Sequence, residues 1–165
     1  MTAEVRTLTI RKMTERDIEP LASAFAWPTR GIESRYRDQE DGKRQVFVAE
    51  LEATPVGSVS INQHDGPPEL LHLFALDVAP QFQKRGFGSA LIGGVERIAA
   101  ERKLSGVWLD VAVDNTNARR LYERVGYHRE GPVVINRWQY IDEQGVQQQA
   151  EETCYRMFKR FAESD

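Results

Sequence analysis

The most informative segment of this sequence is Gln83-Lys84-Arg85-Gly86-Phe87-Gly88, which stands between an apolar segment, 70–78, and an amphipathic segment, 89–102. The apolar segment is almost continuously hydrophobic, which predicts a central strand covered on both faces. In the second segment, apolar residues recur at helical spacing. The sequence therefore predicts a strand, a glycine-containing loop and a helix, in that order.

The loop has the composition of a phosphate-binding site. Gly86 and Gly88 let backbone N–H groups approach a ligand closely, and the following helix begins with unpaired N–H groups at the positive end of its dipole. Lys84 and Arg85 add positive charge for further phosphate oxygens. A plainer alternative is a helix entry with a solvated basic turn. The spacing fits neither a P-loop nor the dinucleotide fingerprint, whose third glycine is replaced by Leu91.

Hydrophobic patterns on either side of this loop predict alternating strands and helices. Before the loop they predict a strand at 7–12, a helix at 14–25, an exposed charged helix at 32–41 and a hairpin of strands 45–51 and 55–61. After it they predict a strand at 107–113, a helix at 118–125 and two strands at 133–140 and up to 158, joined by a turn at 142–145. This order predicts an α+β fold, with a mixed, largely antiparallel central sheet flanked by helices on both faces.

Length and composition narrow the classes of protein. A chain of 165 residues favours one domain over 1–165, and 28% charged with 41% hydrophobic residues is ordinary for a globular protein. The net charge of -3 argues against a nucleic-acid partner. Because no apolar run reaches about 18 residues and the N-terminus lacks a signal-peptide core, we expect no membrane partner and a cytoplasmic location. Cys154 is the single cysteine, so neither an internal disulfide nor a multi-cysteine metal site is expected.

Two motifs together resemble one family. Gln-x-x-Gly-x-Gly between an apolar strand and an amphipathic helix is similar to the acyl-CoA-binding motif of the GNAT superfamily of N-acyltransferases. The segment 115–127, with its Asn, Ala, Leu-Tyr and Gly-Tyr, is similar to the second motif of that superfamily. The resemblance covers residues 70–127. It implies the acyl-CoA N-acyltransferase fold, acetyl-CoA as co-substrate and no metal.

The resemblance also implies which residues hold the acetyl-CoA. It assigns this role to Gln83, Lys84, Arg85, Gly86, Phe87, Gly88 and Ser89, and to Asn115, which can also serve as a helix N-cap. It further implies that Leu76 and Val78 offer backbone groups to the acetyl carbonyl and the pantetheine arm.

Three residues are candidates for proton transfer. The resemblance places Tyr122 at the sulfur of CoA, where a phenol with a pKa of about 10 can protonate the departing thiolate; a core aromatic is the alternative. His72, a polar residue in the apolar strand, is the first candidate for the general base, and Glu69 at the strand entrance is the second. A buried histidine held by a neighbour is the alternative for His72. Asp77 is expected to be structural or to lie near the cofactor.

The expected reaction is transfer of an acetyl group from acetyl-CoA to a primary amine by direct attack in a ternary complex. The favoured acceptor is a small molecule, and residues around Trp27, Arg30, Glu33 and Tyr36 and the loop 131–138 are candidates for selecting it. A protein N-terminus or lysine is the alternative acceptor, and a non-catalytic acyl-CoA-binding regulatory domain is the alternative function. Because dimers are common in the family, a homodimer is a further expectation.

Overall fold

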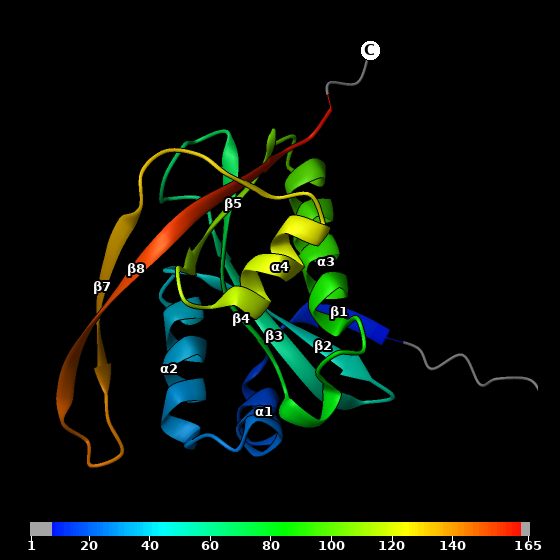
Figure 1. Cartoon of the computed structure of the whole chain (residues 1–165). Helices are drawn as coiled ribbons and strands as arrows, with labels where there is room; N and C mark the ends of the chain where they lie inside the picture. The colour runs from blue at the N-terminus through cyan, green and yellow to red at the C-terminus, as the bar shows by residue number, and fades with distance from the viewer. Residues whose placement is uncertain (1–7, 163–165) are drawn as a thin grey trace, which may run out of the picture. The chain divides into compact units, whose positions relative to one another are not determined.

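The computed structural model describes residues 8–162 (Figure 1). Their contacts divide them into two compact units. Within the described residues, the first unit comprises 8–62 and Ala75–Val95, and the second comprises Gln63–Phe74 and 96–162. Two elements, strand β4 (Leu70–Val78) and helix α3 (Phe87–Glu101), begin in one unit and end in the other.

Three strands of the first unit form antiparallel pairs. They are β1 (Leu8–Lys12), β2 (Gln45–Leu51) and β3 (Thr54–Asn62). The hairpin between β2 and β3 turns on two residues, Glu52 and Ala53, whose φ angles are 51° and 65°. Two consecutive left-handed residues are typical of the tight type I′ turn that matches strand twist. The turn is therefore one residue shorter than the sequence predicted, because Thr54 already pairs with Leu51.

The helices of the first unit cover a core of their own. They are the short 3₁₀ helix η1 (Glu15–Asp17), α1 (Ile18–Phe25) and α2 (Thr29–Glu40). Leu21 and Phe25 pack with Ile32, Val46 and Val48 in this core. The prediction of an exposed helix at 32–41 is wrong in one respect, because Ile32 is buried and ties α2 to α1.

Helix α3 follows the 3₁₀ turn η2 (Pro80–Phe82) and contains two consecutive glycines. A Cβ on Gly94 would lie 3.2 Å from Cδ1 of Ile10, so close packing against β1 accounts for this glycine. A Cβ on Gly93 would meet nothing within 4 Å. Close packing therefore explains one of the two.

The second unit is built on the remaining strands. They are β5 (Gly106–Ala112), β6 (His128–Arg129), β7 (Val134–Ile141) and β8 (Gln147–Arg160), with helix α4 (Thr116–Arg124) between β5 and β6. β4 runs parallel to β5, and β8 runs antiparallel to β5, β6 and β7. Figure 1 shows β7 and β8 as a long two-stranded ribbon.

The α+β class, with helices and largely antiparallel strands, is confirmed. The sequence prediction missed β6, which is two residues long. It also described β4 as covered on both faces, whereas residues 74–78 are half-buried. Among residues 8–162, no helix is long and apolar enough to cross a membrane. The single domain over 1–165 stays a prediction.

Candidate functional site

In the first unit, the loop after β4 presents a run of backbone N–H groups. Lys84 and Gly86 both have left-handed backbones, with φ angles of 62° and 86°. The first intrahelical bond of α3 runs from the N–H of Ala90 to the carbonyl of Gly86, 3.0 Å away. The N–H groups of Phe87, Gly88 and Ser89 precede that bond and have no partner within the helix. Such a turn leading into a helix N-terminus suits an anion.

Side chains of the same loop brace it and leave positive charge at the surface. The Gln83 amide donates to the carbonyl of Val78 at 3.1 Å, which ties the loop to the end of β4. Lys84 and Arg85 are exposed, and the Arg85 guanidinium lies over the Phe82 ring, 5.7 Å from its centroid. Gln83 thus supports the loop backbone, and its contact with a cofactor stays a prediction.

The backbone of β4 changes conformation just before the two residues assigned to the acetyl group. Ala75 has a φ of 50°, a left-handed conformation that occurs in strands at bulges, and half-buried Leu76 and Val78 follow it. A Cβ on Gly57 of β3 would lie 2.7 Å from the carbonyl oxygen of Asp77. Gly57 therefore permits a backbone approach that any other residue would push apart. That Leu76 and Val78 offer backbone groups to the acetyl carbonyl and the pantetheine arm stays a prediction.

The carboxylate of Asp77 forms an ion pair with Arg35. Arg35 of α2 donates to its carboxylate at 2.9 Å and also lies 3.4 Å from the hydroxyl of buried Ser58. The same guanidinium lies 5.0 Å from the centroid of the Trp27 ring. Sequence reasoning missed Arg35. Its spacing of three residues from buried Ile32 was the available signal, since that spacing puts both on one helix face.

In the second unit, His72 is enclosed by aromatic rings. Its ring stacks on Trp108 with centroids 3.8 Å apart and lies 4.9 Å from Phe74. Its Nδ1 is 3.5 Å from the carboxylate of Asp65. Burial lowers the pKa of His72 below its ordinary value, and the nearby Asp65 and Asp110 only partly offset this. The imidazole is therefore neutral near pH 7 and able to accept a proton.

A polar network adjoins this histidine. The Asp110 carboxylate accepts hydrogen bonds from Arg156 at 2.9 and 3.0 Å and from the Asn136 amide at 2.9 Å. The Arg156 guanidinium also lies over the Trp108 ring, 4.5 Å from the centroid. Sequence reasoning missed this network. Alternation in β5 could have indicated it, because Trp108 and Asp110 point away from the face of buried Val107.

The other candidate base, Glu69, is less constrained. Its side chain is exposed, and its backbone carbonyl accepts a hydrogen bond from the N–H of Ser105 at 2.8 Å. That bond ties the entrance of β4 to the turn before β5. Glu69 thus lacks the enclosed surroundings that shift the pKa of His72.

Helix α4 carries Tyr122 and begins at Asn115. Tyr122 is buried, and its ring meets Tyr127 edge-on with centroids 6.0 Å apart. Burial raises the pKa of Tyr127, and Glu96 adds to the rise. Asn115 is the N-cap, because its side-chain oxygen accepts from the N–H of Ala118 at 3.2 Å. The core role considered for Tyr122 and the capping role of Asn115 are therefore both realised, and their catalytic and cofactor roles stay predictions.

The predicted catalytic residues Tyr122, His72 and Glu69 all belong to the second unit, together with Asn115. Leu76, Val78 and the loop residues 83–89 belong to the first unit. The first unit thus contains a helix N-terminus whose geometry suits an anion, and the second contains a histidine with a lowered pKa and a buried phenol.

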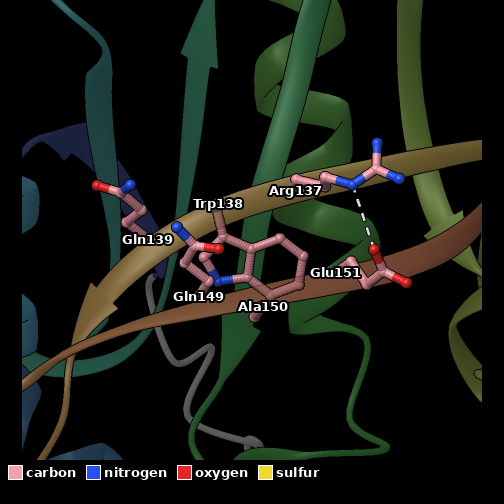
Figure 2. Close-up of a pocket in the computed structure, with 6 residues that line it drawn as sticks. All are labelled: Arg137, Trp138, Gln139, Gln149, Ala150 and Glu151. Carbon is pink, nitrogen blue, oxygen red and sulfur yellow. Dashed lines mark hydrogen bonds and ion pairs between the residues drawn. The ribbon is translucent and has the colours of Figure 1, made fainter.

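A hollow of about 440 Å³ lies on the β7–β8 ribbon of the second unit (Figure 2). It is lined by Arg137, Trp138, Gln139, Gln149, Ala150 and Glu151. Figure 2 shows the Trp138 indole lying toward Ala150, its partner across the strands, and Arg137 paired with Glu151. Of the loop considered for the acceptor, residues 137 and 138 line this hollow, and no predicted acetyl-CoA or catalytic residue does.

Comparison with known sequences gives relatives along much of the chain. An uncharacterized N-acetyltransferase of Methanocaldococcus jannaschii is 28% identical over 153 residues, covering 81% of this chain and 66% of the relative. The ribosomal protein bS18-alanine N-acetyltransferase of Escherichia coli is 25% identical over 111 residues, covering 67% of this chain and 70% of the relative. This chain thus spans about two thirds of the length of these two relatives.

Solved structures share the fold. The E. coli ribosomal-protein-S18-alanine N-acetyltransferase has a TM-score of 0.67 at 19% identity, covering 96% of this chain and 97% of the other. A chimera of Vibrio cholerae spermidine N-acetyltransferase with hSSAT has a TM-score of 0.68 at 22% identity, covering 92% and 93%. An acetyltransferase of Bacillus anthracis, in complex with acetyl coenzyme A, has a TM-score of 0.56 at 18% identity, covering 72% and 62%.

The family model for the acetyltransferase (GNAT) family matches residues 9–127, which include β4, the glycine loop, α3 and the whole of α4. The match contains both motifs on which the resemblance rested, and the predicted family is thereby confirmed. This chain belongs to the acetyltransferase (GNAT) family.

Proposed function

We propose that this protein transfers an acetyl group from acetyl-CoA to a primary amine by direct attack in a ternary complex. The observation that carries the proposal is the loop of the first unit, where left-handed Lys84 and Gly86 lead into the unpaired N–H groups of α3. An anion-binding turn of this kind, beside exposed Lys84 and Arg85, fits the pyrophosphate of CoA. In the second unit, Asn115 is a further proposed contact.

Acetyl-CoA supplies the acetyl group as a thioester. His72, or Glu69 as the second candidate, takes the proton that the ammonium form of the acceptor must lose, directly or through water. The amine nitrogen then bonds to the acetyl carbon, the carbon–sulfur bond breaks, and Tyr122 protonates the departing sulfur. The second proton that the nitrogen loses as the amide forms restores the Tyr122 phenol. Neutrality near pH 7 supports His72 as the first choice, because a protonated imidazole could not act as a base.

The proposed acceptor is the amine of a small molecule. The net charge of -3 favours a cationic acceptor, and a structural neighbour is a spermidine N-acetyltransferase chimera. A second candidate, the N-terminal amine of a protein, is favoured by similarity to the E. coli ribosomal protein bS18-alanine N-acetyltransferase. The two candidates differ in size and in backbone hydrogen bonding, so one panel of acceptors separates them.

Release of CoA thiol, followed with a thiol reagent, tests the proposal. Purified protein is mixed with acetyl-CoA and with spermidine, an aminoglycoside, single amino acids or a peptide with an N-terminal alanine. The protein itself contributes little signal, because burial raises the pKa of its one thiol, Cys154, to about 11. Release that depends on spermidine or another small amine supports the first candidate, and release that depends on the peptide supports the second.

Replacing Tyr122 with Phe separates chemistry from binding. The expected result is a fall in kcat of about a hundredfold with the Kd for acetyl-CoA unchanged, because the phenol acts on the leaving group only. Unchanged kcat would remove Tyr122 from the mechanism. Absence of thiol release from the whole panel, together with tight acetyl-CoA binding, would instead favour a regulatory domain.

A further inference from the structure

A short loop before β4 packs against the enclosed histidine of the second unit. The loop, residues 63–69, carries Asp65, whose carboxylate lies 3.5 Å from Nδ1 of His72. That nitrogen is buried, and no hydrogen bond to another described residue satisfies it. Because a buried polar atom without a partner is costly, closure of Asp65 onto Nδ1 is favoured. The Asp65 side chain is 57% exposed and therefore has the freedom to move that short distance.

Gly66 places the same loop against the aromatic ring on which His72 stacks. A Cβ on Gly66 would lie 2.7 Å from two carbons of the Trp108 indole, so glycine permits a contact that a larger residue would push apart. Trp108 lies opposite His72 on the paired strand, and the planes of the two rings differ by 4°. The loop thus contacts the imidazole directly through Asp65 and indirectly through Trp108.

We propose that Asp65 is a positioning residue for His72, which accepts a hydrogen bond from Nδ1–H and leaves Nε2 to take the proton of the acceptor. This proposal rests on the proposed role of His72 as general base. A neutral imidazole carries its proton on one nitrogen, and only the other nitrogen can accept a proton. When Nε2 takes the proton, the ring becomes an imidazolium, whose charge the Asp65 carboxylate stabilises. The proton then passes to water.

Three charged side chains act on this imidazole. Burial has the largest influence on the pKa of His72 and lowers it, whereas Asp65 and then Asp110 raise it and Arg156 lowers it. Asp110 and Arg156 largely offset each other, because the guanidinium donates to the carboxylate at 2.9 and 3.0 Å. Asp65 is the carboxylate that pairs with Nδ1 itself. Removal of the Asp65 charge should therefore lower the pKa of His72 further.

NMR of the imidazole nitrogens in the full chain tests the hydrogen bond without any substrate. The chemical shifts of Nδ1 and Nε2 report which nitrogen carries the proton, and the signals missing from His72→Gln identify the residue. The unmodified protein should hold the proton on Nδ1 above the pKa of His72. Asp65→Ala should move the proton toward Nε2 and lower the pKa, and Asp65→Glu should restore Nδ1–H. Glu143→Ala removes an exposed carboxylate from the turn between β7 and β8, and as the matched control it should change neither.

Gly66→Ala tests the contact of the loop with the indole. The new Cβ should push the loop away from Trp108 and withdraw Asp65, so this variant should move the proton toward Nε2 as Asp65→Ala does. Gly42→Ala is the control, because Gly42 has a φ of 76°, close to the 70° of Gly66, and open surroundings. Circular dichroism establishes that both variants are folded. A proton that stays on Nδ1 in folded Gly66→Ala would overturn the role of the loop.

Thiol release connects the hydrogen bond to turnover. With an acceptor that supports release, Asp65→Ala should lower kcat about tenfold and leave the Kd for acetyl-CoA unchanged. The expected loss is far smaller than in an enclosed catalytic triad, because water and salt screen the half-exposed carboxylate. The acid limb of the kcat/KM profile should move to lower pH, and Asp65→Glu should recover part of the rate.

The two measurements separate failure of this proposal from failure of the proposed function. Unchanged nitrogen shifts in Asp65→Ala would overturn the proposal, and so would altered shifts with unchanged kcat. Absence of thiol release from the unmodified chain would instead count against acetyl transfer, and the nitrogen shifts would still decide whether Asp65 holds Nδ1 of His72.

Discussion

Lys84 adopts a backbone conformation that residues other than glycine seldom have, because its φ of 62° falls in the left-handed region. Holding such a residue there costs about 1 kcal/mol or more, and residues strained in this way recur at ligand-binding and active sites. Gly86, two residues on, shares the left-handed conformation without that cost. We therefore propose that the loop has the backbone shape for an anion before any ligand binds.

Gly86→Ala tests the function of this shape. A Cβ at Gly86 would meet nothing within 4 Å, so the substitution acts only through φ. We expect the Kd for acetyl-CoA, measured by calorimetry, to rise about tenfold, which corresponds to about 1.4 kcal/mol. Gly131→Ala is the control, because Gly131 has a φ of 76° and equally open surroundings. Equal weakening by both substitutions would contradict a specific role for the loop.

The pH dependence of kcat/KM tests His72. Burial lowers the pKa of His72 below its ordinary value of about 6.5, so the neutral, active base persists to a lower pH than in an exposed histidine. Activity should therefore fall as pH drops through that lowered pKa, and His72→Ala should abolish this acid limb. Glu69→Gln should leave it in place. An acid limb that survives in His72→Ala and disappears in Glu69→Gln would make Glu69 the base.

Some features of single residues can be predicted from the local sequence, whereas others depend on residues that are distant in the chain. The glycine loop and the Asn115 cap were predictable, because local sequence determines both. For Arg35 and Asp110, helix and strand spacing signals only which face each residue lies on. Their partners, Asp77 and Arg156, were not predictable, because each pair joins residues dozens of positions apart. The left-handed Ala75 was also unpredictable, since alanine gives no signal of positive φ.

At the scale of elements, the start of the first helical segment depends on one buried carboxylate. Asp17 accepts hydrogen bonds from the backbone N–H of Thr14 at 2.8 Å and from Arg11 at 2.6 and 2.7 Å. Arg11 also reaches Glu50 on β2 at 2.5 Å. Asp17 thus links β1 to the helical segment formed by η1 and α1.

Asp17→Asn should lower the free energy of unfolding by about 1–3 kcal/mol at pH 7. Although burial alone would raise the pKa of Asp17, the bonds from Arg11 and Thr14 lower it overall. Its stabilising contribution is therefore present above an ordinary aspartate pKa of about 4 and is lost as pH falls through the lowered value. Urea unfolding should show a gap between the two proteins at pH 7 that narrows at pH 3. Exposed Asp41→Asn should produce no such gap.

The type of nearly every element could be predicted from hydrophobic periodicity, because amphipathic helices and alternating strands show their period within a short stretch of sequence. Boundaries were less accurate where tertiary packing decides them. Helix α2 begins at Thr29 rather than Ile32, since Pro28 ends the preceding turn and starts the helix. Strand β6 went unpredicted because its two residues pair through contacts with β8 that no short pattern encodes.

At the scale of the whole molecule, β4 and α3 are shared between the two units. Both are continuous hydrogen-bonded elements, so neither unit can be separated without cutting a strand and a helix. We therefore propose that the chain unfolds as one domain, and differential scanning calorimetry should record a single transition whose calorimetric and van't Hoff enthalpies agree. Two resolved transitions would contradict this prediction, whereas the same unfolding midpoint by circular dichroism and Trp fluorescence would support it.

The lone thiol of Cys154, buried in β8, has a practical consequence for spectroscopy. Its pKa of about 11 leaves very little thiolate at neutral pH, so maleimide dyes and nitroxide labels should not react with it. A cysteine introduced at any exposed position then becomes the sole point of attachment, without prior removal of a native one. The natural sequence is thus ready for paramagnetic or fluorescent reporters that follow acetyl-CoA binding in real time.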